Sequence, residues 1–390
     1  MGQASPAAKC AGDGKAPPFV DPNRKLDRMP DPASYFARSY AEARAALREA
    51  ATAAGLSVDA RAHPLRGPDG EELSTDAVWI GPKDARRLLV SISGTHGGEG
   101  YCGSGVQCGM LETGRYRDLP ADTAVLIVHA INPHGFAWTR RVTEDNVDLN
   151  RNFVDFAAPL PENAGYAELH ETICPPRWDQ ETIEQTFSAL MAYAERHSMA
   201  ALQQAVSGGQ YGFDDGLFFG GQRPTWSHRT LEELLRRYGA AAKAVAVVDY
   251  HTGLGPFGHG ERICPHPAGS AARARAEDWY GGDITATDDG TSTSAPLVGT
   301  NDIGIARALP QAEVTQIALE YGTQPLFEVI NALRGDNWLH AHGDPQGPES
   351  RAIKAEMRRC FYPGTPEWCR MIWDRAVETE DLALAGLKQA

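Results

Sequence analysis

Residues 86–100, RRLLVSISGTHGGEG, carry the chain from a short apolar run directly into a glycine-rich stretch that holds a histidine and a glutamate. The apolar run is typical of a strand that is buried on both faces. His96 and Glu99 are three residues apart, so a single turn can present both side chains to one point. Four neighbouring glycines allow the unusual backbone angles that such a turn would need: Gly97, Gly98, Gly100 and Gly103. The stretch is either a tight polar turn or half of a metal site.

The same alternation of apolar runs and helical patterns continues along the chain. Short apolar runs predict strands at residues 86–93, 123–131, 244–250 and 314–320. Helical patterns occupy residues 31–55, 181–206, 230–242, 324–334 and much of 350–388. Asp31 is the expected N-cap of the first helix, and Thr230 and Glu233 have capping-box spacing. Strands interspersed with helices indicate an α/β fold with parallel strands at the centre of its sheet.

The domain organisation is predicted to be simple. Residues 1–30 are rich in proline, glycine, alanine and charge, and are expected to form a poorly ordered N-terminal arm. No internal repeat or linker divides the rest, so residues 31–390 are expected to form a single catalytic domain.

Composition excludes several classes of partner. The chain has 37 Lys and Arg against 51 Asp and Glu, a net charge of −14, whereas nucleic acids and anionic membranes require a basic surface. No segment approaches the 18 or so apolar residues of a membrane-spanning helix, and no secretory signal is recognisable. The seven cysteines are scattered and lack CxxC spacing. We therefore expect a cytoplasmic protein with reduced thiols, a small-molecule or peptide partner, and no nucleic acid or membrane partner; the oligomeric state is left open.

Polar side chains follow each predicted strand. The first strand leads to His96 and Glu99, the second to NPHG (132–135) and TRRVTEDNVDLNRNF (139–153), the third to Asp249-Tyr250-His251, and the fourth to Glu320. In an open α/β sheet, ligands bind beyond the carboxyl ends of the strands. Four separate segments therefore bring histidines, glutamates, arginines and asparagines to one place.

Zinc chemistry explains these residue types. A catalytic zinc commonly takes three protein ligands, with two histidines and one glutamate among the known sets, and keeps a further position open. His96, Glu99 and His251 form such a set, so the sequence predicts one Zn²⁺ ion. The His-x-x-Glu pair alone is more typical of a polar turn, and the whole set is what favours zinc.

The ordered motifs resemble those of the zinc carboxypeptidase family, of which carboxypeptidase A is the type. They are His96-x-x-Glu99, Asn132-Pro133-x-Gly135 with Arg141, VDLNRNF (147–153), His251 and Glu320, and they cover roughly residues 80–330. VDLNRNF is the most specific of them. The resemblance implies a three-layer α/β/α sandwich around a mixed, largely parallel sheet of eight strands. The segment GQYGFDDGLFFGGQRPTWS (209–227) is similar to a bacterial branch of the family rather than to its digestive enzymes.

The resemblance also implies roles for single residues. Glu320 matches the general base that takes a proton from a zinc-activated water and delivers it to the leaving amine. Arg141 matches the arginine that stabilises the oxyanion, although its neighbour Arg140 is an alternative. Asn150 and Arg151 match the pair that binds the terminal carboxylate of the substrate. Asp148 matches the acid that orients a ligand histidine.

Two features concern substrate handling. The family has a mobile active-site tyrosine about twenty residues before the glutamate, but STSAPLVGTND (292–302) contains none, and Tyr211, Tyr280 and Tyr321 cannot be aligned with it. The segment 209–227 is a candidate specificity pocket, through the side chains of Asp214, Asp215, Phe218, Phe219, Arg223 and Trp226.

Three functions are consistent with these observations. The first is a zinc-dependent metallocarboxypeptidase-like hydrolase that cleaves an amide bond next to a free carboxylate. The second is an N-acyl amino acid deacylase, similar to succinylglutamate desuccinylase and aspartoacylase. The missing tyrosine favours the deacylase, whereas NPHG and VDLNRNF favour the peptidase, so the expected substrate is a small peptide or an N-acyl amino acid. The third is a non-catalytic binding protein on the same fold, which the complete set of site residues disfavours.

Overall fold

The structure is a computed structural model that describes residues 30–390. The predicted N-terminal arm therefore lies, except for its last residue, outside the described residues. Asp31–Ala390 form one compact unit. Within the described residues, no helix is both long and apolar enough to cross a membrane. The cytoplasmic location and the classes of partner stay predictions.

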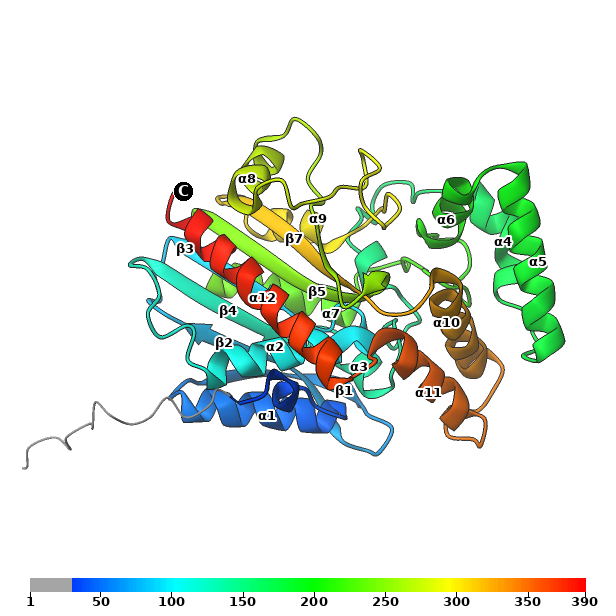
Figure 1. Ribbon diagram of the computed structural model, residues 1–390, viewed down its shortest axis with the longest axis horizontal. Helices are drawn as coiled ribbons and strands as arrows, with labels where there is room; N and C mark the ends of the chain where they lie inside the picture. The colour runs from blue at the N-terminus through cyan, green and yellow to red at the C-terminus, as the bar shows by residue number, and fades with distance from the viewer. Residues whose placement is uncertain (1–29) are drawn as a thin grey trace, which may run out of the picture. The chain divides into compact units, whose positions relative to one another are not determined.

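A mixed sheet lies at the centre of this unit (Figure 1). The described residues contribute seven strands to it, in the order β1-β2-β4-β3-β5-β7-β6, where the family resemblance implied eight. The strands are β1 (Val58–Arg66), β2 (Glu72–Ile80), β3 (Arg87–Ile92), β4 (Thr123–His129), β5 (Ala244–Phe257), β6 (Gly260–Ile263) and β7 (Glu313–Gly322). The four central strands, β4, β3, β5 and β7, run parallel, while β2 and β6 pair antiparallel with them.

The four central strands are the four apolar runs predicted from the sequence. They are buried on both faces, which is why their sequences are continuously apolar. The three strands that the sequence did not reveal lie toward the edges. β1 alternates exposed and half-buried positions, β2 contains several buried polar residues, and β6 is only four residues long.

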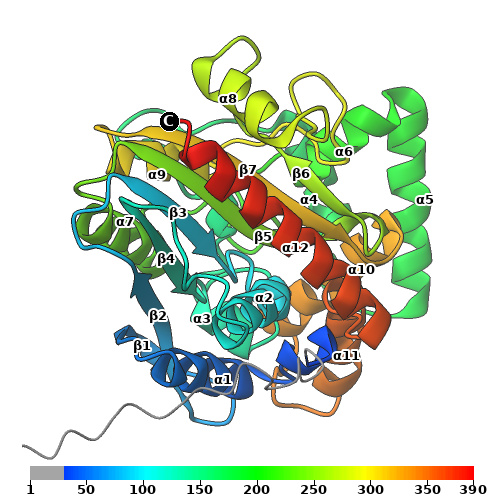
Figure 2. The same cartoon turned by 60° about the vertical axis from the view of Figure 1, so that its left-hand side comes forward.

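Helices cover both faces of the sheet (Figure 2). One apolar cluster joins alternate strand residues to α1 (Tyr40–Ala53), α2 (Gly100–Glu112), α8 (Ala271–Tyr280) and α12 (Pro366–Leu387). A second cluster joins the opposite strand residues to α7 (Trp226–Tyr238) and α9 (Asn301–Ala308). The predicted three-layer α/β/α sandwich is thus confirmed.

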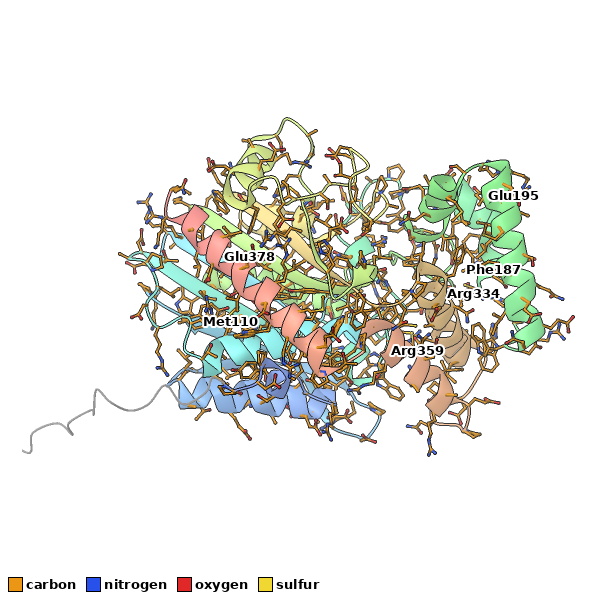
Figure 3. All side chains as sticks on the ribbon, viewed as in Figure 1. Met110, Phe187, Glu195, Arg334, Arg359 and Glu378 are labelled. Carbon is orange, nitrogen blue, oxygen red and sulfur yellow. The ribbon has the colours of Figure 1, made fainter. Side chains whose placement is uncertain are left out.

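A third apolar cluster lies in a group of helices beside the sandwich, which we call the helical lobe. It comprises α4 (Ala164–Ile173), α5 (Gln180–Arg196), α6 (Met199–Ser207), α10 (Leu326–Ala341) and α11 (Ser350–Phe361). Arg334 of α10 ties the lobe together, since its guanidinium donates to the Thr186 hydroxyl of α5 at 2.6 Å and to the Ile173 carbonyl of α4 at 2.9 Å (Figure 3). The lobe supplies one wall of the cavity described below.

Several predicted helix boundaries are wrong for local reasons. The 181–206 pattern is two helices, because Ser198 caps a new one by accepting from the Ala201 amide at 3.0 Å. The 350–388 pattern is likewise α11 and α12, which are separated by a turn with Gly364 at φ +64°. Thr225, not Thr230, caps α7.

The N-terminal prediction needs the same kind of correction. Asp31 caps a short 3-10 helix, η1 (Pro32–Tyr35), while Ser39 caps α1.

Candidate metal centre

The first two predicted ligands lie where β3 ends. His96 precedes a single 3-10 turn, η2 (Gly97–Glu99), that continues directly into α2, so both side chains belong to one tight turn. The prediction that the glycines of this turn provide unusual backbone angles is wrong. In this stretch only Gly94 has a positive φ, of +69°.

Close packing is the reason for these glycines instead. A Cβ on Gly97 would lie 2.0 Å from the carbonyl carbon of Gly135, and one on Gly100 would lie 2.7 Å from the Phe136 ring. Both neighbours belong to α3 (Pro133–Ala137), a short helix that begins at the proline of the NPHG motif. The glycines therefore let α3 lie directly against the ligand-bearing turn.

The third predicted ligand lies inside a strand rather than after it. β5 extends to Phe257, so His251 is a strand residue, and it is paired in register with Glu320 of the parallel neighbour β7. Alternation along β5 places Asp249 and His251 on the same face, two residues apart. Register alone thus brings a histidine, its carboxylate neighbour and the predicted base to adjacent positions.

His96, Glu99 and His251 form a buried triad whose ligand atoms all lie within 4.8 Å of one another. The Nδ1 atoms of the two histidines are 3.2 Å apart, Glu99 Oε1 is 3.0 Å from Nδ1 of His96, and Glu99 Oε2 is 3.2 Å from Nδ1 of His251. Ligands about 2.0–2.1 Å from a tetrahedral zinc are about 3.3 Å from each other. The donor types and their spacing therefore fit a zinc-sized divalent cation.

The outer nitrogen of each histidine faces a carboxylate. Nε2 of His251 is 2.7 Å from Asp249 Oδ2, and Nε2 of His96 is 3.2 Å from Asp148 Oδ1. Such pairs orient a ligand imidazole. At His96 the Arg141 Nη2 donor lies closer to Nε2, at 2.9 Å, so the carboxylate alone fixes the protonated nitrogen only at His251. Asp148 was assigned this position from the sequence. Asp249 was not, although its Asp-x-His spacing on a strand is the signal that would have found it.

The triad is a region that favours positive charge. Burial disfavours ionisation of His251, but the Asp249 and Glu99 carboxylates outweigh it and hold the pKa of His251 well above its usual value. Burial likewise opposes the charge on Glu99, and His96, His251 and Arg141 together hold the pKa of its carboxyl well below the usual range. A cation bound between these groups would take the place of the proton.

Glu320 lies beside the triad without belonging to it. Its Oε1 accepts the Leu254 amide at 2.9 Å. Burial and the negative charge of Glu99 raise the pKa of Glu320 to about 8. A carboxyl group in this state is poised to exchange a proton near neutral pH.

The two adjacent arginines point to different places. Arg141 faces the triad, where it donates from Nη1 to Glu99 at 3.0 Å and from Nε to Asp148 at 2.9 Å. Arg140 instead donates from Nε to Asp336 of α10 at 3.0 Å. Of the two, Arg141 is therefore the one that contacts the triad.

Asn150 and Arg151 lie on a 3-10 turn, η3 (Leu149–Arg151), that the Asp148 side chain caps. The Arg151 guanidinium is buried and donates to the carbonyls of Asn150 and Ser207, at 2.9 and 2.6 Å. Its Nε is buried and has no hydrogen-bond partner among the described residues. Burial lowers the pKa of Arg151. An anionic ligand would therefore satisfy both its charge and its free donor.

Phe218 packs against both site arginines. The Cζ atoms of Arg141 and Arg151 lie 5.2 and 5.6 Å from the centre of its ring, and its backbone adopts a φ of +54°. A positive φ is costly for a bulky residue and occurs most often at functional sites.

Phe218 is the only one of the six predicted pocket residues in 209–227 that lines the cavity of the site. The prediction is wrong for the others because they have partners elsewhere or are exposed. For example, Asp215 lies 3.4 Å from His170, and the Trp226 ring packs on His63.

A cavity of about 180 Å³ contains the whole arrangement. All three triad residues line it, together with Arg141, Asn150, Arg151 and Glu320. No tyrosine is among its described lining residues. Tyr211 donates to the buried Arg151 carbonyl at 2.6 Å, and Tyr280 and Tyr321 belong to the core, so these three do not replace the family's tyrosine.

The fold and the site together define an α/β protein with a buried His-Glu-His centre that can hold a metal ion. Residues 36–375 match the family described as "Protein of unknown function (DUF2817)", and the chain belongs to this family. The sequence matches none of the curated proteins with which it was compared.

Among solved structures, the chain is similar to carboxypeptidases and to a deacylase. Bovine thrombin-activatable fibrinolysis inhibitor is 12% identical, with a TM-score of 0.40, over 88% of this chain and 99% of that one. Carboxypeptidase A from Helicoverpa armigera is 12% identical, with a TM-score of 0.39, over 84% and 74% of the two chains. Succinylglutamate desuccinylase from Chromobacterium violaceum is 17% identical, with a TM-score of 0.34, over 82% and 74%.

Proposed function

We propose that this protein is a zinc-dependent hydrolase of amide bonds that lie next to a free carboxylate. The observation that carries the proposal is that one cavity unites three features: the His96-Glu99-His251 triad, the Glu320 carboxyl beside it, and the buried Arg151, whose Nε has no hydrogen-bond partner among the described residues. Metal ligation, proton transfer and carboxylate binding are the three tasks that this reaction requires.

Substrate binding begins at the arginine. The substrate carboxylate approaches Arg151, whose guanidinium is held in place by two backbone carbonyls. Asn150 assists, because its Oδ1 accepts the Asn301 amide at 2.9 Å and its Nδ2 is thereby left to donate to the ligand. Binding of the carboxylate positions the adjacent amide bond toward the triad.

The chemical step is then hydrolysis with Glu320 as the proton carrier. A divalent metal held by His96, Glu99 and His251 would polarise the carbonyl and lower the pKa of water. Glu320 accepts a proton as the water oxygen bonds to the carbonyl carbon, and it donates that proton to the amide nitrogen as the C–N bond breaks. A carboxylic acid and an amine result. Arg141 supplies positive charge beside the carbonyl oxygen, where negative charge develops.

The runner-up substrate class is an N-acyl amino acid rather than a peptide. Both classes present the same amide and the same carboxylate, and they differ only in the acyl part. The small cavity and the absence of a lining tyrosine among its described residues favour the smaller acyl compounds. A small peptide is the other proposed substrate.

The test combines metal analysis with a substrate panel. Protein purified without chelator is expected to bind one zinc and to hydrolyse members of a panel of N-acyl amino acids and short peptides. Glu320→Gln is expected to keep the zinc and to lose activity by about 10²–10⁴-fold. If the protein hydrolyses only the acyl compounds, its activity is that of a deacylase and not of a carboxypeptidase. A protein that binds zinc stoichiometrically and hydrolyses no member would contradict the hydrolase proposal and favour a binding protein.

A further inference from the structure

The cavity is lined by further polar residues that the proposed reaction does not use. Residues alternate along β7, so Gln316, Ala318 and Glu320 face the cavity from one side of the strand. Asn301 and Asp302, at the start of α9, line the same cavity. Glu320 serves the reaction, whereas Gln316, four residues earlier on the strand, and Asp302 have no part in it.

The orientation of the Gln316 amide follows from a chain of hydrogen bonds. Asp249 is an acceptor for both His251 Nε2 and Asn301 Nδ2, each at 2.7 Å, which identifies Nδ2 as the donor of Asn301. Asn301 Oδ1 must then accept from Gln316 Nε2, also at 2.7 Å. The remaining atom of this amide is therefore the oxygen, Oε1. It is buried and has no hydrogen-bond partner among the described residues.

Asp302 carries a second free acceptor. Its Oδ1 is buried and likewise has no hydrogen-bond partner within the described part of the chain. Burial raises the pKa of Asp302, although Thr300 and the first backbone amides of α9 oppose the shift. Among the described lining residues, Asp302 is the one acid besides Glu99 and Glu320. Buried acceptors without donors are unfavourable, so they indicate that a ligand supplies the donors.

We propose that Gln316 and Asp302 select substrates whose carboxylate-bearing residue has a cationic side chain, an amine or a guanidinium. The inference rests on the proposed function, because Arg151 must hold the carboxylate of that residue. The residue then spans the cavity, with its negative group at the arginine and its positive group at Asp302. Gln316 Oε1 accepts a further N–H from the same group. An apolar side chain would leave both acceptors without donors.

Matched amino acids that correspond to the released product provide the test. Binding of L-lysine and L-norleucine, and of L-arginine and L-citrulline, is measured by calorimetry on the zinc-loaded full chain. Lysine differs from norleucine by its ammonium group, and citrulline replaces the guanidinium of arginine by a neutral urea. We expect the cationic member of each pair to bind about 10-fold more tightly or better, since hydrogen bonds to charged groups are the stronger ones.

Two variants test whether Asp302 and Gln316 cause the preference for cationic amino acids. Asp302→Asn removes the charge, and Gln316→Met removes the amide acceptor at similar volume; each is expected to reduce the lysine-to-norleucine ratio to within about 3-fold of unity. Asp374→Asn, at an exposed position of α12, is the matched control and is expected to keep the full ratio. Thermal melting shows which variants are folded, and either folded variant suffices to test the assignment.

The outcomes separate this inference from the proposed function. Equal binding of lysine and norleucine, an unchanged ratio in a folded variant, or no binding of any amino acid overturns the inference. Hydrolysis that prefers apolar residues overturns it while leaving the hydrolase proposal in place. Selective lysine binding without hydrolysis of any substrate supports the inference about the cavity and contradicts the hydrolase.

Discussion

Two buried clusters of charged side chains lie next to each other, and the adjacent residues Arg140 and Arg141 each enter one of them. In the cluster around Asp336, which we call the paired cluster, Arg140 and Lys354 both donate to the Asp336 carboxylate, at 3.0 and 2.5 Å. A cavity lined by Arg140 and Asp336 has a volume of about 10 Å³, which holds one water at most. Around the triad, by contrast, donors and acceptors face a cavity of about 180 Å³.

The difference separates structural charge from functional charge. Each charge of the paired cluster meets an opposite charge from the protein itself, so the cluster joins the segment that follows α3 to α10 and α11. At the triad, two imidazoles and a carboxylate converge on one point, while Arg151 Nε, Gln316 Oε1 and Asp302 Oδ1 have no protein partner among the described residues. Burial of charge alone does not identify a site; the convergence of ligand-type side chains on one cavity does.

The largest expected effect concerns metal binding. His251→Ala removes one of three ligands and is expected to lower zinc affinity by more than about 10²-fold. The paired cluster also contains His340, whose Nε2 lies 3.0 Å from Lys354 Nζ. His340→Ala is therefore the matched control and should leave one zinc per chain. Competition with a chromogenic chelator measures both. Equal zinc affinity in the His251 variant and the native chain would show that the triad is not the metal site.

The next effect concerns stability. Asp336→Ala leaves the buried Arg140 and Lys354 charges without their common partner and is expected to cost about 3–5 kcal/mol of unfolding free energy. Urea denaturation of the metal-free protein measures this cost. The zinc content of the folded variant is expected to be unchanged. A loss of zinc at unaltered stability would mean that the two clusters are not separate in function.

A third effect contrasts the two arginines. Arg141→Lys is expected to lower kcat/KM by about 10²–10³-fold, because lysine cannot reproduce the geometry of the guanidinium beside the carbonyl. Arg140→Lys is expected to keep kcat/KM within a few-fold of the native value and to lower the melting temperature instead. Steady-state kinetics on the best panel substrate distinguishes them, and the reverse pattern would assign the site to Arg140.

The smallest effect is a pH dependence of stability in the paired cluster. Burial and then Arg140 lower the pKa of His340 to about 3, so the folded protein keeps this imidazole neutral. Below an ordinary pKa of about 6.5 the unfolded chain binds a proton that the folded chain refuses, so stability falls as the pH decreases from about 6.5 toward 3. The slope is about 1.4 kcal/mol per pH unit for one group.

His340→Gln tests this slope, since glutamine keeps an acceptor for Lys354 and does not titrate. Urea denaturation between pH 7 and pH 4 is expected to show a shallower decline for the variant than for the native chain. Identical slopes would exclude His340 as a source of the pH dependence.

Much of the site could be predicted because it depends on local sequence. The four central strands are apolar on both faces, and the potential metal ligands lie at or just after their predicted ends. The parallel centre of the sheet and the His-Glu-His set could therefore be predicted from the same segments. The edge strands were missed because β1 and β2 carry polar side chains where one face meets solvent or other polar groups. Asp249 was overlooked although its spacing from His251 was visible, because the strand was predicted to end at residue 250, whereas β5 continues through His251 and so places both side chains on one face.

The sequence by itself determined the α/β class, the triad of potential metal ligands and the order of the site residues. Strand burial and ligand chemistry depend on residue types and on short spacings along the chain. Tertiary structure decided which way each side chain points and which elements pack against each other. It decided that Arg141 and not Arg140 faces the triad, that the glycines around His96 serve close packing with α3, and that Phe218 alone of its segment's candidates reaches the cavity. It also decided that Gln316 and Asp302 line the same cavity, since only the pairing of β5 with β7 and the placement of α9 bring them beside it.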